Sequence, residues 1–285
     1  MSEFAILTDS ACDITPSLLS EWGVGVMNLS FAFENGETDE NMTITEFYNR
    51  MRAGQVAKTS AINPDAFTKA FEDVLKTGSD VLYLAFSSGL STTCNSARIA
   101  AEELAADYPD RKIAVVDSLC ASAGQGLFVY LVSHKREDCP SLEELAEYAE
   151  NLKLKICHWF TVDDLVYLKR GGRVSPAVAF VGSVLGIKPV MHVDNDGHLV
   201  GVSKARGRRA AIAALANKYE ELAENPSGGE VFICHGDCLA DANTLAEMLR
   251  EKWNITVRVI ADIGPVIGAH SGPGTLAVFF VGKER

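Results

Sequence analysis

The chain has 285 residues, of which 47% are hydrophobic and 22% charged, and its 26 Lys and Arg face 38 Asp and Glu. This composition is typical of a soluble globular protein, and the length favours two domains or one large α/β domain. The net charge of −12 argues against the nucleic-acid backbone as a general partner, and no apolar run approaches the roughly 20 residues of a membrane span. We therefore expect neither nucleic-acid binding nor stable membrane insertion.

The cysteines and the N-terminus favour a cytoplasmic protein. Seven widely spread cysteines fit reduced thiols better than a disulfide framework, and the start MSEFAILTDS lacks the features of a signal peptide. Cys234 and Cys238 have no second ligand pair at zinc-finger spacing, so no metal site is expected. No G-x-G-x-x-G follows a strand and no G-x-x-x-x-G-K-[ST] occurs, so we expect no NAD, no P-loop nucleotide and no other cofactor.

The first half of the chain alternates apolar runs with helical segments. Strands are predicted at residues 4–7, 24–33, 81–86 and 112–116. Helices are predicted from Pro16 onward, at 43–52, at 65–76, after Ser91, at 119–134 and at 141–152. Capping boxes at Thr43 and Ser141, and Asn63 as a cap before Pro64, mark the starts of three of them. The alternation is typical of an α/β domain with a Rossmann-like parallel sheet and helices on both faces, which we place at residues 1–155.

Hydroxyl residues follow the strands at two places. The run 81–86 has no charge, which predicts a strand buried on both faces, and Ser91 stands after it as a candidate helix N-cap. Hydroxyls and free backbone N–H groups at the carboxyl end of a strand suit an anion, although an ordinary strand–turn–helix junction explains them equally well. Thr59 and Ser60 lie in a polar loop, residues 58–64, ahead of the next helix.

The pattern changes after residue 155. Strands are predicted at 156–162, 190–193, 198–203, 230–235, 255–260 and 276–281, and helices at 163–169, 177–187, 206–222 and 239–253. The turn Asp194-Asn195-Asp196-Gly197 is typical of a β-hairpin, so the second sheet is at least partly antiparallel. We therefore expect a second α/β domain with a mixed or antiparallel sheet and helices at residues 156–285.

Seven short motifs occur in order along the chain. They are T-D-S at 8–10, T-S-x-x-x-P at 59–64, S-S-G-L-S at 87–91, D-S at 117–118, L-x-x-L-K-R-G-G-R-V-S at 165–175, K-P at 188–189 and G-P-V-I-G-A-H-S-G-P-G at 264–274. Their order and spacing resemble, from end to end, the DegV family, the bacterial fatty-acid-binding proteins also called FakB. The resemblance implies a non-catalytic carrier with one long-chain fatty acid held between two domains.

The resemblance also implies a partner and a binding site. FakB-type members present the carboxylate of the bound acid to a fatty acid kinase, and the acyl phosphate enters phospholipid synthesis. Carried over by motif, the residues expected to bind the carboxylate are Thr59 or Ser60, Ser91 and His270. The residues expected to line or support the same region are Arg170 or Arg173, and Ser271. Residues 61–63 and 92–94 depart from the usual family pattern. We therefore expect the head-group loop and the shape of the pocket to differ from those of typical family members.

Two further groups of residues are candidates for a role. The helix predicted at 177–187 is apolar on every side, which fits either a buried packing helix or the wall of an acyl tunnel. Its candidate tunnel residues are Phe180, Val184 and Ile187. A basic group at the start of the helix predicted at 206–222 is either a solvated face or a partner surface, and consists of Lys204, Arg206, Arg208 and Arg209.

A catalytic alternative remains open from the residues alone. His270 lies between glycine-rich turns, where a loop histidine is more often functional than structural. A serine hydrolase or acyltransferase would use Ser91 as nucleophile, His270 as base and Asp9 or Asp117 to orient the base. No G-x-S-x-G elbow is present, and the resemblance favours binding.

Overall fold

The computed structural model describes residues 4–34, 36, 42–139, 141–174 and 186–285. The described strands are β1 (Phe4–Asp9), β2 (Val24–Met27), β3 (Ser30–Phe33), β4 (Ala57–Ser60), β5 (Asp80–Ala85), β6 (Ile113–Asp117), β7 (Ile156–Thr161), β8 (Ile187–Val193), β9 (Leu199–Arg206), β10 (Glu230–His235), β11 (Thr256–Asp262) and β12 (Leu276–Val281). The described α-helices are α1 (Pro16–Glu21), α2 (Ile44–Arg52), α3 (Pro64–Leu75), α4 (Thr93–Asp107), α5 (Ala123–Lys135), α6 (Leu142–Leu152), α7 (Val166–Arg170), α9 (Arg208–Leu222), α10 (Leu239–Trp253) and α11 (Pro265–Ser271).

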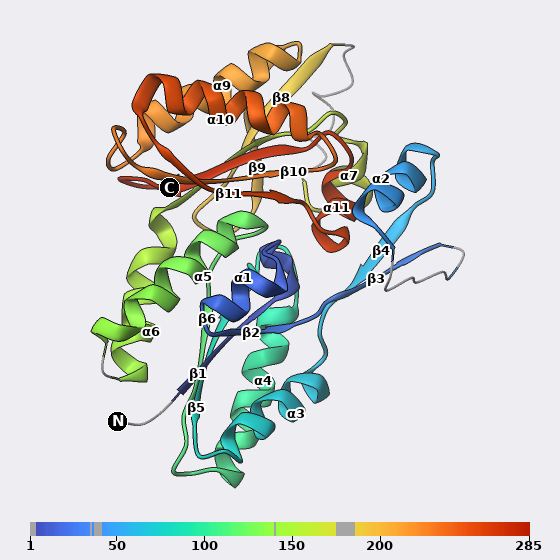
Figure 1. Ribbon diagram of the computed structural model, residues 1–285. Coiled ribbons are helices and arrows are strands. Elements are labelled where there is room, and N and C mark those ends of the chain that lie inside the picture. The colour runs from blue at the N-terminus through green and yellow to red at the C-terminus, as the bar shows by residue number, and fades with distance from the viewer. Residues whose placement is uncertain (1–3, 35, 37–41, 140, 175–185) are drawn as a thin grey trace.

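The first sheet has four parallel strands in the order β2-β1-β5-β6, as the alternation of the first half predicts. Every residue of β5 is buried. Tyr83 packs in a cluster with residues of α3 and α4, whereas Leu82 and Leu84 pack in a cluster with residues of α5 and α6. Because side chains alternate along a strand, helices cover both faces of this sheet (Figure 1). The prediction of a strand buried on both faces is confirmed.

The second sheet has six strands in the order β11-β10-β12-β7-β8-β9. Only β10 and β11 pair in parallel among these strands, so the sheet is mixed, and the predicted hairpin forms between β8 and β9. Helices α9 and α10 cover the outer face (Figure 1). The inner face contacts α5, which belongs to the first half of the chain.

Helix α5 lies close to the second sheet because it carries a glycine at the contact. A Cβ atom on Gly124 would lie 2.6 Å from Cδ1 of Phe279 and would also meet the imidazole of His158. This approach creates one hydrophobic core cluster shared by α5 and the strands β7, β10 and β12. The division into domains 1–155 and 156–285 stays a prediction.

The prediction of a single strand at residues 24–33 is wrong, because this segment forms the two strands β2 and β3. The hydroxyl of Ser10 accepts the N–H of Leu29, and the chain leaves the first sheet there. Strand β3 then pairs antiparallel with β4 outside both main sheets. Thr59 and Ser60 consequently lie in a strand rather than in the predicted loop.

Strands β3 and β4 and helix α2, which together we call the arm, reach the second half of the chain. Figure 1 shows the arm projecting away from the first sheet beside α7 and α11. Its aromatic residues Phe31, Phe33, Phe47 and Tyr48 pack with one another and with Ala269 of α11. The arm therefore carries first-half residues to the surface of α11.

Several predictions in the second half are corrected or untested. Residues 175–185 lie outside the described part of the chain, which leaves the predicted helix and its residues Phe180 and Val184 untested. Ile187 begins strand β8 instead of ending a helix. Gly207, at φ +85°, separates β9 from α9, so Arg206 belongs to the strand. His270 lies in helix α11 and not in a loop, since the glycines around it cap a short helix.

Candidate functional site

A cavity of about 580 Å³ lies between the two sheets, within the size range of small-molecule sites. Its lining from the first half includes Leu29, Thr59, Phe86, Ser91, Ala121 and Ser122. Its lining from the second half includes Phe160, Arg173, Val193, Ile263, His270 and Phe279. Neither half alone encloses the cavity, whose wall is mostly apolar with a few polar groups.

Thr59 and His270 join the two halves at one wall of the cavity. Oγ1 of Thr59 lies 2.8 Å from Nε2 of His270. The arm positions Thr59 because Phe31 of β3 is its partner in the strand pair. Helix α11 positions His270 in its last turn. Two of the residues predicted to bind a carboxylate therefore lie in direct contact.

The imidazole of His270 is neutral at pH 7. Burial, with a smaller effect of the neighbouring Arg173 guanidinium, lowers its pKa to about 4. Its Nδ1 atom is buried and has no hydrogen-bond partner among the described residues. A Cβ atom on Gly171 would collide with this nitrogen, so the ring fits only because residue 171 has no side chain.

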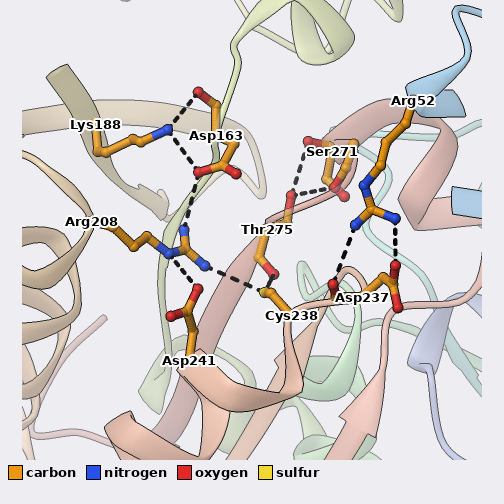
Figure 2. Close-up of polar contacts among 10 residues, drawn as sticks. Arg52, Asp163, Lys188, Arg208, Asp237, Cys238, Asp241, Ser271 and Thr275 are labelled. Atoms are coloured by element: carbon orange, nitrogen blue, oxygen red, sulfur yellow. Dashed lines mark hydrogen bonds and ion pairs between the residues drawn. The ribbon is translucent and has the colours of Figure 1, made fainter. Parts of the chain in front are cut away.

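A second polar atom without a partner lies beside His270. Ser271 is among the cavity-lining residues, and its buried Oγ makes no hydrogen bond to any described residue. Thr275, by contrast, donates from Oγ1 to the carbonyls of Ser271 and Gly272, which fixes the end of α11 (Figure 2). Leaving a buried polar atom unpaired costs about 1–3 kcal/mol, so the unpaired atoms of His270 and Ser271 are a cost in the ligand-free protein.

Ser91 also lines the cavity. In the chain it stands one residue before the N-cap of α4. The N-cap of α4 is Thr92, and Oγ of Ser91 instead accepts the N–H of Thr93 and contacts its hydroxyl at 2.9 Å. The predicted N-cap was thus wrong by one residue. Among the described contacts, Ser91 has no hydrogen bond to His270.

Asp9 and Asp117 hold the loop before Ser91. Oδ2 of Asp9 accepts the hydroxyl of Tyr83 and the N–H of Phe86, and burial raises the pKa of Asp9. Oδ1 of Asp117 accepts the N–H of Ser88. Neither aspartate is hydrogen bonded to His270 among the described contacts, so neither orients the imidazole as a hydrolase would require.

The structure separates the alternatives that the motifs left open. Arg173 lines the cavity, and its Nε donates to the carbonyl of Leu90 across the gap between the halves. Arg170 is exposed, with its guanidinium 5.8 Å from the ring centroid of Tyr167, and is not among the cavity residues. Ser60 is likewise exposed and outside the lining.

The four residues of the predicted basic group differ in exposure. Lys204, Arg206 and Arg209 are exposed. Arg208 is held internally: its Nε donates to Asp241 at 2.8 Å, and its Nη1 lies 3.7 Å from Asp163 (Figure 2). Including Arg208 in a surface face was therefore wrong.

The apolar wall was only partly anticipated. Ile187 is half-buried and is not among the described cavity residues. The described wall comes instead from inward-facing residues of β7 and β12, such as Phe160, Ala277 and Phe279. The predicted strands contained these residues, but a buried strand does not reveal which of its faces borders a cavity.

Within the described residues, the one group able to converge on a metal ion is Asp194, Asp196 and His198, at the turn between β8 and β9. Asp196 and His198 are exposed, and the backbone N–H groups of both donate to Oδ1 of Asp194. No helix in the described ranges is both long and apolar enough to cross a membrane.

Comparisons with known proteins give a consistent result. A model of the DegV family, described as uncharacterised, matches residues 3–283. A DegV domain-containing protein of Clostridium perfringens is 44% identical, covering 100% of this chain and 99% of that protein. A DegV lipid-binding protein from Thermotoga maritima is 32% identical with a TM-score of 0.84, covering 99% of both chains. A fatty-acid-binding DegV family protein from Thermus thermophilus is 29% identical with a TM-score of 0.88, covering 98% of this chain and 99% of that one.

Proposed function

This chain belongs to the DegV family, and from that premise we propose that it binds one long-chain fatty acid in the cavity between its sheets. The observation that carries the proposal is the polar wall of the cavity. There Thr59 and His270 meet at 2.8 Å, and Ser91, Arg173 and Ser271 line the same cavity. The similar proteins from Thermotoga and Thermus are described as lipid-binding and fatty-acid-binding, which supports the same ligand class.

The carboxylate would bind at this polar wall. Ser91 would donate a hydrogen bond to it, and so would the pair formed by Thr59 and the neutral His270, which has one proton left to donate after the contact between them. Ser271 and the positively charged Arg173 line the same cavity. Hydrogen bonds to an ionised carboxylate contribute about 1.5–3 kcal/mol each, roughly twice the value for neutral partners. The donors come from both halves, so the carboxylate would bind only when the halves are closed on each other.

The acyl chain would occupy the apolar remainder of the cavity. Burying a CH₂ group contributes about 0.8 kcal/mol, so a chain of about fourteen methylenes would contribute roughly 11 kcal/mol before the costs of binding. Phe160, Val193 and Phe279 supply the apolar surface in the described part of the chain. An affinity of this kind predicts a ligand that remains bound through purification.

We further propose that the protein is a cytoplasmic, non-catalytic carrier that presents the carboxylate to a fatty acid kinase for phospholipid synthesis. The exposed cations Lys204, Arg206 and Arg209 form the candidate docking face on a chain of net charge −12. The serine hydrolase alternative is less well supported. Ser91 and His270 share no hydrogen bond in the described contacts, and Asp9 and Asp117 accept backbone N–H groups of the loop before Ser91 rather than binding His270.

The proposal is tested by comparing an acid with its matching alcohol. Affinities for palmitic acid and hexadecan-1-ol are measured by fluorescence displacement for the wild type, Ser91→Ala and His270→Ala. We expect each variant to bind the acid about tenfold more weakly and the alcohol almost unchanged, because one charge-assisted donor is lost. Equal weakening of both ligands, or no change, would contradict the site. Turnover of p-nitrophenyl esters that disappears in Ser91→Ala would favour the hydrolase instead.

A further inference from the structure

One peptide bond in the second half is held on both sides by side chains of the first half. It joins Ile263 to Gly264, immediately before helix α11. The hydroxyl of Tyr48 donates to the carbonyl of Ile263 at 2.9 Å. The N–H of Gly264 donates to Oδ1 of Asp13, also at 2.9 Å. Both polar groups of this peptide are therefore bound to residues more than 200 positions earlier in the chain.

The two side chains that hold this peptide are themselves fixed. Asp13 is buried, and its Oδ2 accepts the hydroxyl of Ser122 at 2.5 Å, at the start of α5. Tyr48 is fully buried and packs edge-to-face against Phe47, with 5.2 Å between the ring centroids. Because neither side chain is free to follow a moving helix, they hold the N-terminus of α11 in one place.

Two glycines, Gly268 in α11 and Gly236 after β10, make the contact with Tyr48 possible. A Cβ atom on Gly268 would lie 2.6 Å from the hydroxyl of Tyr48 and 3.0 Å from Cε1 of Phe47. A Cβ atom on Gly236 would lie 3.2 Å from the same hydroxyl. The face of α11 that meets the arm is therefore shaped to receive Tyr48.

We propose that Asp13 and Tyr48 are positioning residues of the carboxylate site. Helix α11 has seven residues, and binding both polar groups of the peptide before it fixes its rotation about its own axis. That rotation determines whether the imidazole of His270, in the last turn, meets Thr59. The inference rests on the proposed function, since it assigns these residues a role in recognising the carboxylate.

The test separates positioning from general stability. Affinities for palmitic acid and hexadecan-1-ol are measured for the wild type, Tyr48→Phe and a matched control, Tyr219→Phe. Tyr219 is also fully buried, and its hydroxyl donates to the carbonyl of Pro226 at 2.9 Å, but it does not line the cavity. Each substitution removes one hydroxyl that donates to a backbone carbonyl, and the melting temperature of each variant is measured so that a loss of stability can be separated from a loss of preference for the acid.

The expected readout is the ratio of the two affinities. Tyr48→Phe should lower the preference for the acid over the alcohol by about threefold to tenfold, whereas Tyr219→Phe should leave it unchanged. A preference in Tyr48→Phe equal to that of the wild type would overturn the inference. If Tyr48→Phe does not fold, Asp13→Ala, which removes the acceptor of the Gly264 N–H, is measured in the same way, and an unchanged preference there would overturn the inference.

The outcomes also distinguish this inference from the proposed function. If the wild type binds neither palmitic acid nor hexadecan-1-ol, the proposed function fails and the inference fails with it. If the wild type prefers the acid and Tyr48→Phe, or Asp13→Ala in its place, keeps that preference, only the inference fails.

Discussion

Thr59 and His270 meet at 2.8 Å although 211 positions separate them in the chain. Thr59 reaches this point on the arm, which leaves the first sheet, and His270 reaches it on α11, which connects strands β11 and β12 of the second sheet. The contact therefore depends on the relative placement of the two halves of the chain.

Gly171→Ala should displace His270. A methyl group at residue 171 would occupy the place of the imidazole Nδ1, and the ring would have to turn away from Thr59. We expect palmitic acid to bind about tenfold more weakly, as after loss of a charge-assisted hydrogen bond, with hexadecan-1-ol much less affected. Fluorescence displacement measures both, and an acid affinity equal to that of the wild type would show that the ring has room.

His270 should titrate at low pH in the ligand-free protein. Its pKa of about 4 lies below the ordinary value of 6.5 because the ring is buried. The unfolded chain therefore takes up the proton first, so the contribution of His270 to stability is present above pH 6.5 and lost as pH falls towards 4. Histidine NMR spectra across this range give the midpoint directly, and a midpoint near 6.5 would contradict the burial.

Asp13 should make stability fall as pH rises. Burial raises its pKa from 3.8 to about 8, so the folded protein holds this proton more tightly than the unfolded chain does. The stabilisation is present below pH 3.8 and is lost as pH rises to about 8. Urea unfolding between pH 4 and 8 should therefore show the wild type losing stability relative to Asp13→Asn. If the free energy of unfolding changed with pH in parallel for the two proteins, the raised pKa of Asp13 would be ruled out. Asp9 is present in both proteins, so its own titration cancels in the comparison.

Gly268→Ala and Tyr48→Phe should interact when combined. The methyl group of Gly268→Ala would collide first with the Tyr48 hydroxyl, 2.6 Å from the new atom, and Tyr48→Phe removes that oxygen. The double variant should therefore lose less stability than the sum of the losses in the two single variants, by about 0.5–3 kcal/mol, as is usual for residues in contact. Urea unfolding of the four proteins in this cycle measures the coupling, and strict additivity would mean that the contact does not constrain α11.

Reversing the charge of Arg206 and Arg209 should impair the proposed kinase step alone. Both side chains are exposed, so replacement by Glu should leave the amount of bound fatty acid unchanged while lowering acyl-phosphate formation by a fatty acid kinase. Arg208 is left intact because it is paired with Asp163 and Asp241. Equal acyl-phosphate formation by the wild type and the double variant would remove the docking role.

Local signals in the sequence predicted local structure well. The side chains of Thr43, Asn63 and Ser141 each accept the N–H three residues later, at the starts of α2, α3 and α6. These caps need only neighbouring residues, so their sequence patterns suffice. The buried strand β5 was recognisable for a similar reason, because a short uncharged run between turn residues has few other solutions.

What the sequence could not predict depends on distant partners. Thr59 and Ser60 were equivalent as loop residues, but alternate residues of β4 point to opposite sides, so only Thr59 lines the cavity. The glycine-rich segment before β12 indicated a loop, whereas the structure places Gly268 of that segment against Tyr48 of the arm. Arg208 looked like a surface cation until Asp163 and Asp241 were brought beside it by the fold (Figure 2).

Native mass spectrometry of the purified protein tests the central claim most directly. The account predicts a protein heavier than its chain by one long-chain fatty acid, released on denaturation and identified by its mass in the extract. It also predicts that, after delipidation, added palmitic acid restores the one-to-one complex and raises the melting temperature. A protein with no acyl species in the extract, and no change in mass or melting temperature with added palmitic acid, would contradict the account.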